Sequence, residues 1–294
     1  MPTSVSTIVL TKNEEHNLPD CLATLAWADQ ILVVDSFSAD ATVEIARRHG
    51  ATVMQHPFSD FAAQHNWAQS QAQHDWVLFI DADERVSPEL ALEIRRLADA
   101  DQLGRCTAYH IERVHLFSGR WLFSDPARRR VTPRYRQHLK RVEVPRLIDR
   151  RVAVWERPLH ETVRAPEPHG VLDGVILHYA STNLSAHYES FNSYTDREAA
   201  YLQHTLGRLP VGLIEAIARG IRAFLYVYIW RGWYKFGEQG LLMAITNGYA
   251  KFMNYAKLWE RIRIQNEQGI WTKRDKKLLT QFKANTPDDP AGKP

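Results

Sequence analysis

The chain has 294 residues, 45% of them apolar, and a formal net charge of +3, which allows one full α/β domain plus an appendage. Only two cysteines, Cys21 and Cys106, are present, which argues against a disulfide framework or a cysteine-based zinc site. No apolar run reaches 18 residues, so no transmembrane helix is predicted, and the absence of a signal-like start favours a cytoplasmic location.

Charge is distributed unevenly along the chain. Residues 1–103 carry 6 Lys/Arg against 16 Asp/Glu, residues 104–204 carry 16 against 11, and residues 205–294 carry 15 against 7. The acidic part suits a divalent cation, whereas the basic parts suit an anion such as phosphate or acidic lipid.

The first hundred residues alternate between strand and helix patterns, which predicts βαβ units and a parallel sheet. The expected strands are Ser6–Leu10, Ile31–Val34, Ala51–Met54 and Trp76–Ile80, and the expected helices are Asn17–Ala28, Ala39–His49, Phe61–Gln73 and Pro88–Ala100. We expect Ser38 or Asp40 to cap the second helix, Gly50 to end it, and Ser87 to cap the fourth.

Acidic residues follow three of these strands. Ser6–Leu10 runs into Asn13 and Glu14, Ile31–Val34 runs into Asp35 and Asp40, and Trp76–Ile80 runs into Asp81, Asp83 and Glu84. Ligands of open parallel sheets bind outside the carboxyl ends of the strands, so the three clusters are expected to converge. Crowded carboxylates repel one another unless a cation or hydrogen-bond donors separate them, which predicts a site for a metal and a nucleotide.

The positions of the glycines limit how this chain could bind the phosphates of a nucleotide. The first glycine is Gly50 and the next is Gly104, so the dinucleotide fingerprint and the P-loop are both excluded. A metal held by the Asp81-Ala82-Asp83 segment is the expected substitute, and Mg²⁺ or Mn²⁺ prefers such oxygen ligands. Glu84 is either part of this site or a cap for the next turn.

The middle of the chain is strand-like but irregular. Strands are expected at Thr107–Ile111, Val152–Trp155 and Val175–Tyr179. Residues 128–151 contain ten Lys/Arg, which form either a solvated loop or an anion site on the acceptor side. A third interpretation is that residues 128–151 bind nucleic acid. No recognised nucleic-acid-binding fold accompanies this basic segment, so we expect no nucleic-acid partner.

The last third is predicted to be helical from Leu184 to about Ile270. Two amphipathic stretches there carry apolar stripes with Trp and Tyr at their edges and an excess of Lys/Arg. Such helices either lie in a membrane interface or pack on the α/β domain, and the pattern leaves both readings open. The expected division of the chain is 1–104, 105–183 and a membrane-associating helical extension, 184–294; the family resemblance carried by the motifs implies nucleotide-sugar binding for the first part and the acceptor side for the second.

These motifs, in this order, carry a family resemblance. The segments are Val9-Leu10-Thr11-Lys12-Asn13-Glu14-Glu15, Val33-Val34-Asp35-Ser36-Phe37-Ser38-Ala39-Asp40-Ala41-Thr42 and Trp76-Val77-Leu78-Phe79-Ile80-Asp81-Ala82-Asp83-Glu84-Arg85. The chain resembles glycosyltransferase family 2, and within it the bacterial enzymes of lipopolysaccharide core synthesis. The resemblance covers residues 5–100 strongly and continues more loosely through Leu159-His160-Glu161 and Leu177-His178-Tyr179. Phe37 stands where a glycine is common, and Ala39 where a threonine is common.

The resemblance implies a fold and a set of site residues. The fold would be α/β of the GT-A (Rossmann-like) type, a mostly parallel sheet with flanking helices, extended here by the C-terminal amphipathic helices. The nucleotide would be bound by Thr11, Asn13, Glu14, Asp35, Gln64, Asn66 and Asp81, and the metal by Asp83. His178, which precedes Tyr179 in an apolar strand, is either a further metal ligand, a phosphate contact or a structural histidine. Glu161 would be the catalytic base, although a surface carboxylate paired with Arg157 or Arg164 is the alternative.

The resulting hypothesis is a metal-dependent (Mg²⁺ or Mn²⁺), inverting glycosyltransferase. It would move a sugar from a nucleotide-sugar donor, UDP-linked by preference, to an anionic lipid-linked glycan such as lipopolysaccharide core. The protein would lie on the inner face of the cytoplasmic membrane. Transfer to a polyprenyl phosphate or a protein, a non-catalytic nucleotide-sugar-binding module, and a phosphotransferase with Asp81 as nucleophile are the alternatives.

Overall fold

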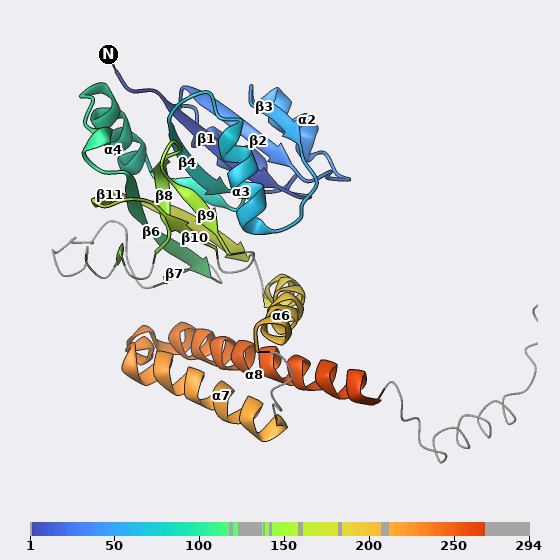
Figure 1. Ribbon diagram of the computed structural model, residues 1–294. Helices are drawn as coiled ribbons and strands as arrows, with labels where there is room; N and C mark the ends of the chain where they lie inside the picture. Colours follow the sequence, from blue (N-terminus) through green and yellow to red (C-terminus); the bar gives the residue numbers. More distant parts are fainter. Residues whose placement is uncertain are drawn as a thin grey trace, which may run out of the picture. The chain divides into compact units, whose positions relative to one another are not determined.

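The computed structural model describes residues 2–117, 120–122, 137, 139–140, 143–157, 161–181, 184–206 and 212–267. The chain divides into two compact units, Met1–Tyr188 and Glu189–Pro294, and each is described by itself. Figure 1 shows a sheet with helices in the first unit and long helices in the second.

Four parallel strands form one side of the sheet in the first unit. They are β1 (Val5–Thr11), β2 (Gln30–Asp35), β3 (Thr52–Gln55) and β4 (Trp76–Asp81), in the order β3-β2-β1-β4. Every one was expected from its apolar run. In register, Thr11 lies beside Asp35 and Leu10 lies beside Asp81, so three strand ends meet at one edge.

The helices between these strands also occur as predicted, although several are shorter. They are α1 (Leu18–Ala23), α2 (Thr42–Arg48), α3 (Phe61–Ser70) and α4 (Pro88–Asp99). The hydroxyl of Ser87 accepts the N–H of Leu90, which confirms the cap of α4, and Gly50 follows α2 with a φ of 76°. Ala41 occupies the N-cap position of α2 without a side-chain cap, so the prediction of Ser38 was wrong, whereas Asp40 Oδ1 accepts the N–H of Thr42, the first residue of the helix, at 3.1 Å.

The remaining strands extend the sheet with mixed direction. They are β5 (Glu84–Val86), β6 (Ala108–Phe117), β7 (Arg120–Leu122), β8 (Pro145–Asp149) and β11 (His169–Ser181), and the sheet continues β4-β8-β6-β11-β5 with β7 on β6. A short 3₁₀ turn, η1 (Leu103–Arg105), precedes β6. Only β6 and β11 pair in parallel among these. Strand β8 lies inside the Arg-rich stretch that the sequence predicts to be irregular.

Apolar side chains cover both faces of the sheet. On one face, Leu90 and Ile94 of α4 are fully buried against the strands, and Gly174 of β11 allows this approach, since a Cβ there would lie 2.3 Å from the Cα of Leu90. On the other face, Phe79 packs edge-on against Trp155. Trp155 belongs to a separate two-stranded sheet, β9 (Val154–Glu156) and β10 (Thr162–Arg164).

The second unit is helical within the described residues. Its elements are α6 (Leu184–Leu206, which begins in the first unit), α7 (Leu213–Leu225), a π-helical turn η2 (Tyr226–Trp230), η3 (Trp233–Phe236) and α8 (Gly237–Glu267). Helices α7 and α8 cross at Gly220 and Gly248, where a Cβ on Gly220 would lie 2.9 Å from the carbonyl oxygen of Gly248. No helix that the structure describes is long and apolar enough to cross a membrane.

Candidate active site

The loops after β1 and β2 are joined by hydrogen bonds. Lys12 Nζ donates to the carbonyl oxygen of Ser36 at 2.9 Å. The backbone N–H of Asn13 donates to Ser38 Oγ at 2.8 Å, and Asn13 Oδ1 accepts the N–H of Ala39, also at 2.8 Å. Asn13 and Phe37 both have a positive φ, 56° and 59°, so Phe37 adopts the conformation for which glycine is usual. The two strand ends thus form one connected rim.

Asp35 is the buried centre of this rim. It is 0% exposed, and its carboxylate accepts hydrogen bonds from Thr11 Oγ1 at 3.2 Å, the N–H of Ser38 at 2.9 Å and Gln55 Nε2 at 3.1 Å. Burial raises the pKa of Asp35, but the hydrogen bonds from Ser38, Gln55 and Thr11 outweigh it and lower the pKa overall. Ser38, one of the expected caps of α2, thus binds Asp35 instead.

Glu14 connects the rim to the end of β4. Burial raises its pKa, a hydrogen bond from Asn17 lowers it, and the negative charges of Asp83, Asp40 and Asp81 raise it further. Carboxylates from the ends of β1, β2 and β4 therefore do act on one another, as the strand pattern predicts. A cation between such groups relieves their repulsion.

Arg146 of β8 is a member of the site that the sequence did not single out. Its Nη2 atom lies 3.1 Å from Asp81 Oδ2 and 2.9 Å from Glu84 Oε1, and Arg113 Nη1 contacts the same Glu84 oxygen at 3.4 Å. Glu84 is 0% exposed and also accepts the N–H of Asp81 at 2.9 Å. Glu84 is thus a buried ion-pair partner, and Asp81 faces a guanidinium.

Opposing effects set the pKa values in this cluster. Burial raises the pKa of Asp81, but the charge and hydrogen bond of Arg146 outweigh it, so its pKa lies well below the usual range. Burial raises the pKa of Glu84, and the attraction of Arg146 only partly offsets this. Folding therefore shifts the two pKa values in opposite directions, that of Asp81 downward and that of Glu84 upward.

Asp83 and His178, which the sequence analysis names as metal ligands, lie side by side. Asp83 Oδ2 is 3.1 Å from His178 Nε2, and the carbonyl oxygen of Asp83 accepts the N–H of Tyr179 at 2.9 Å. His178 Nδ1 lies 2.7 Å from Nδ1 of His115, whose pKa is lowered to about 3 by burial and by the positive charges of His178 and Arg113. His115 was not predicted, because it becomes visible only when β6 and β11 are paired.

This donor set fits Mg²⁺ or Mn²⁺. No group of three or more His, Cys, Asp or Glu side chains among the described residues could hold a metal. One carboxylate and one imidazole nevertheless suit a cation that takes its other ligands from water and from a diphosphate. Asp83 and His178 are the two residues that would hold it.

Glu161 stands immediately before β10, half-buried. Burial lowers the pKa of His65 and the charge of Glu161 opposes this, while the same charge adds to those of Glu84 and Asp81 in raising the pKa of Arg146, so Glu161 acts on the same cluster as Asp81. Its predicted neighbour His160 lies outside the described residues. The alternative partner Arg164 pairs instead with Glu156.

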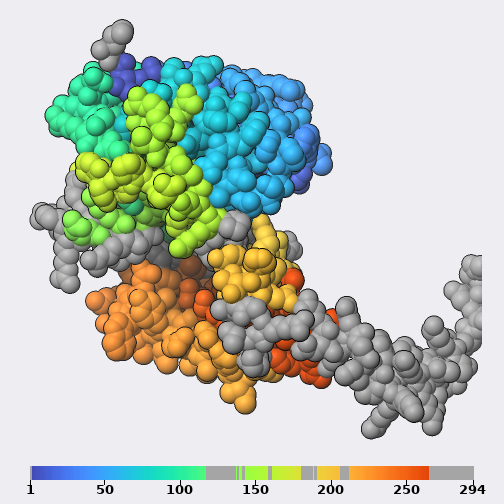
Figure 2. All heavy atoms as spheres, in the orientation of Figure 1, coloured from blue at the N-terminus to red at the C-terminus, as the bar shows by residue number. Residues whose placement is uncertain are grey.

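Gln64 and Asn66 of α3 take up different positions. Gln64 is 1% exposed and donates to Ser36 Oγ at 3.2 Å, which links α3 to the rim. Asn66 donates to the carbonyl oxygen of Trp155 at 2.8 Å and accepts its N–H at 2.9 Å, so its amide holds β9 against α3. In Figure 2 these two segments form one continuous surface. A nucleotide contact by either residue stays a prediction.

Comparison with known proteins places this site in a family. The model of "Glycosyl transferase family 2" matches residues 6–152, half of the chain. An uncharacterised glycosyltransferase of Rickettsia prowazekii is 27% identical over 265 residues, with 86% of each chain covered. One of Rickettsia bellii is 27% identical over 296 residues, covering 97% of this chain and 95% of the relative.

Two solved structures share more remote similarity. Staphylococcus aureus TarS 1–349 has a TM-score of 0.48 at 15% identity, covering 92% of this chain and 93% of that one. Glucosyl-3-phosphoglycerate synthase from Mycobacterium tuberculosis, in complex with Mn²⁺, UDP and glucosyl-3-phosphoglycerate, has a TM-score of 0.31 at 20% identity, covering 39% and 44%.

Proposed function

This chain belongs to glycosyl transferase family 2 and is a glycosyltransferase, and we propose that it is a metal-dependent, inverting enzyme that uses a UDP-sugar. The observation that carries the proposal is the pair Asp83 Oδ2 and His178 Nε2, 3.1 Å apart beside the acidic rim of Glu14 and Asp81. A divalent cation held there would neutralise charge that develops on the leaving diphosphate.

Other side chains of this protein bind the nucleoside and deprotonate the acceptor. Thr11, Asn13, Glu14 and Asp35 shape the rim that receives the nucleoside, and Asp81 lies beside it at the end of β4. Glu161 takes the proton from the acceptor hydroxyl while that oxygen bonds to the anomeric carbon. The bond between that carbon and the diphosphate breaks on the opposite face, and UDP leaves with its electron pair.

The test is a panel of nucleotide-sugars scored by release of the nucleoside diphosphate, with Mg²⁺, with Mn²⁺ and with EDTA. We expect turnover of one UDP-sugar with either metal and none with EDTA. Asp83→Ala should abolish turnover, whereas Asp20→Ala, which removes an exposed carboxylate of α1, should not change it. Full turnover by Asp83→Ala, or in EDTA, would contradict the metal-dependent mechanism.

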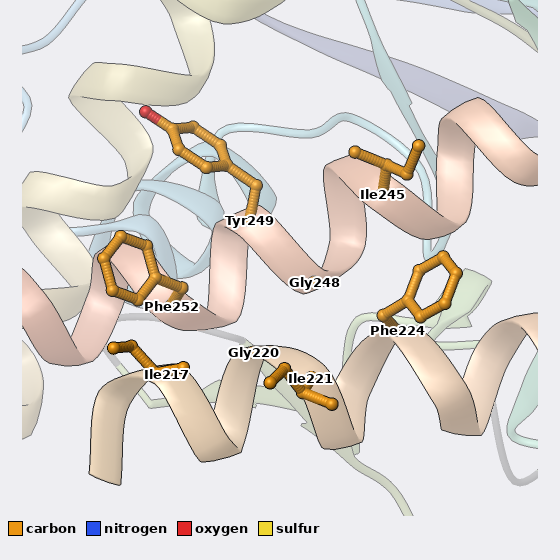
Figure 3. A pocket seen from close by; sticks show the side chains of 8 residues that line it. All are labelled: Ile217, Gly220, Ile221, Phe224, Ile245, Gly248, Tyr249 and Phe252. Atoms are coloured by element: carbon orange, nitrogen blue, oxygen red, sulfur yellow. The ribbon is translucent and has the colours of Figure 1, made fainter. Parts of the chain in front are cut away.

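We further propose that α7, η2 and α8 dock on the inner leaflet and that the acceptor is an anionic lipid-linked glycan. Ile214 and Trp230 are 83% and 85% exposed, and Ile221 is 56% exposed. An apolar groove of about 450 Å³ lies between α7 and α8. The residues that line it are shown in Figure 3: Ile217, Gly220, Ile221, Phe224, Ile245, Gly248, Tyr249 and Phe252. Arg222 and Arg231 flank η2 in the sequence, which suits anionic lipid.

Liposome flotation tests this placement. The full-length protein should float with vesicles containing phosphatidylglycerol, and the double variant Ile214→Ser/Trp230→Ser should float at least tenfold less. Leu92→Ser is the matched control, because Leu92 is an exposed apolar residue (66%) of α4 in the other unit. Equal flotation of the double variant and the wild type would exclude this face as the membrane contact.

A further inference from the structure

A hydrogen bond joins two histidines beside the proposed metal ligands. His115 Nδ1 lies 2.7 Å from His178 Nδ1, and the two rings meet edge to face with centroids 4.8 Å apart. At that separation one nitrogen must carry the proton and the other must accept it. Whether Nδ1 of His115 donates or accepts this hydrogen bond therefore determines whether Nδ1 of His178 carries hydrogen.

The register of the sheet fixes this contact. Strands β6 and β11 run parallel, with His178 directly opposite His115, and β5 pairs on the other side with Glu84 opposite His178. The N–H of Tyr179 also binds the carbonyl oxygen of Asp83 at 2.9 Å. The carboxylate, His178 and His115 are thus held in a row by backbone pairing across β5, β11 and β6.

Two proton arrangements of this row leave His178 neutral. When His115 donates, His178 Nε2 carries hydrogen and donates to Asp83 Oδ2, which lies 3.1 Å away. When His178 donates from Nδ1, its Nε2 presents a lone pair next to the carboxylate oxygen. Two acceptors that close repel each other unless a cation lies between them, so the second arrangement is the one that suits a metal.

We propose that His115 is a positioning residue for the metal site: it accepts the Nδ1 hydrogen of His178 and so directs Nε2 of His178 toward a divalent cation shared with Asp83. This inference rests on the proposed metal-dependent function. Metal-binding histidines generally give their second N–H to a neighbouring acceptor, and loss of that acceptor typically weakens metal binding by about 10- to 100-fold.

Titration of full-length protein with Mn²⁺ in the presence of UDP, followed by the electron paramagnetic resonance signal of free Mn²⁺, tests the proposal. We expect His115→Phe to weaken Mn²⁺ binding by about 10- to 100-fold. His115→Asn keeps an acceptor close to the position of Nδ1 and should recover most of that loss. His110→Phe is the matched control, since it removes a buried histidine of the same strand that contacts His169 instead, and should bind as wild type does.

A second measurement covers the case in which His115→Phe does not fold. Nitrogen-15 NMR of the wild type with Mg²⁺ and UDP should find His178 protonated at Nδ1. Protonation at Nε2, or wild-type Mn²⁺ affinity in folded His115→Phe, would overturn the inference. If Asp83→Ala and His178→Ala also bind Mn²⁺ as wild type does, the proposed metal site itself fails. If those two variants lose Mn²⁺ and His115→Phe does not, only the role of His115 fails.

Discussion

Nη2 of Arg146 lies 2.9 Å from Oε1 of Glu84, a carboxylate with no exposed surface. Because removal of one partner leaves a buried charge uncompensated, Arg146→Met should lower the free energy of unfolding by about 3–5 kcal/mol in urea denaturation. The same substitution at Arg48, which pairs with Glu44 on the exposed face of α2, should change it by less than about 1 kcal/mol. Recovery in the double variant Arg146→Met/Glu84→Gln would attribute the loss to the buried charge, and no recovery would refute that cause.

Glu161→Gln should lower kcat by about 10²- to 10⁴-fold with little change in the KM for the donor, since the amide cannot accept the acceptor's proton. Initial rates of UDP release over a range of donor concentrations measure this. Glu156→Gln is the control, because Glu156 is partly exposed and pairs with Arg164. A kcat within threefold of wild type would remove Glu161 from the role of base.

Stability below pH 5 should depend on Asp35. A carboxyl whose pKa is lowered by folding contributes stability that is present above its unfolded pKa, about 3.9, and is lost as pH falls through the folded value. Asp35→Asn should therefore be less stable than wild type at pH 7 and show a flatter decline between pH 5 and pH 2. Urea unfolding at each pH checks this, and an equally steep decline in Asp35→Asn would contradict the prediction.

The crossing of α7 and α8 should tolerate no side chain at Gly248. A Cβ there would lie 2.9 Å from the Cβ of Phe224 and 3.0 Å from the carbonyl oxygen of Gly220. Gly248→Val should lower the melting temperature and expose α7 to limited proteolysis, with a loss of about 1–3 kcal/mol. Gly212→Ala is the control, because a Cβ at Gly212 meets no atom within 4 Å. An unchanged melting temperature of Gly248→Val would show that α7 and α8 can move apart without loss of stability.

Local pattern was enough to predict the strands β1 to β4 and the acidic ends that they bring together. Five consecutive apolar residues before Asp81 indicate a buried strand, and this prediction needs no information from the rest of the chain. Arg146 and His115 were missed for a different reason. Each acts through a partner at least 60 residues away, Glu84 or His178, and a charge run or a lone histidine contains no information about strand register.

Ser38, one of the two residues predicted to cap α2, does not cap it, because tertiary structure competes for its side chain. A serine shortly before a helix usually caps it, but Ser38 hydrogen-bonds Asp35 and the N–H of Asn13 instead. The long basic segment hid strand β8 (Pro145–Asp149) in a similar way, because Leu147 and Ile148 are outnumbered by the arginines around them. In both places a pattern that is reliable in isolation gave way to long-range pairing.

The hydrogen bonds between the β1 and β2 loops have a consequence for recognition. Lys12, Asn13, Ser38 and Ala39 already hold these loops together in the ligand-free chain. The nucleotide-sugar that we propose to bind here would therefore meet loops that are already ordered, and little further loss of conformational entropy would oppose its binding. Loops that are ordered before binding favour discrimination by shape, so a nucleoside that does not fit between the β1 and β2 loops would bind poorly.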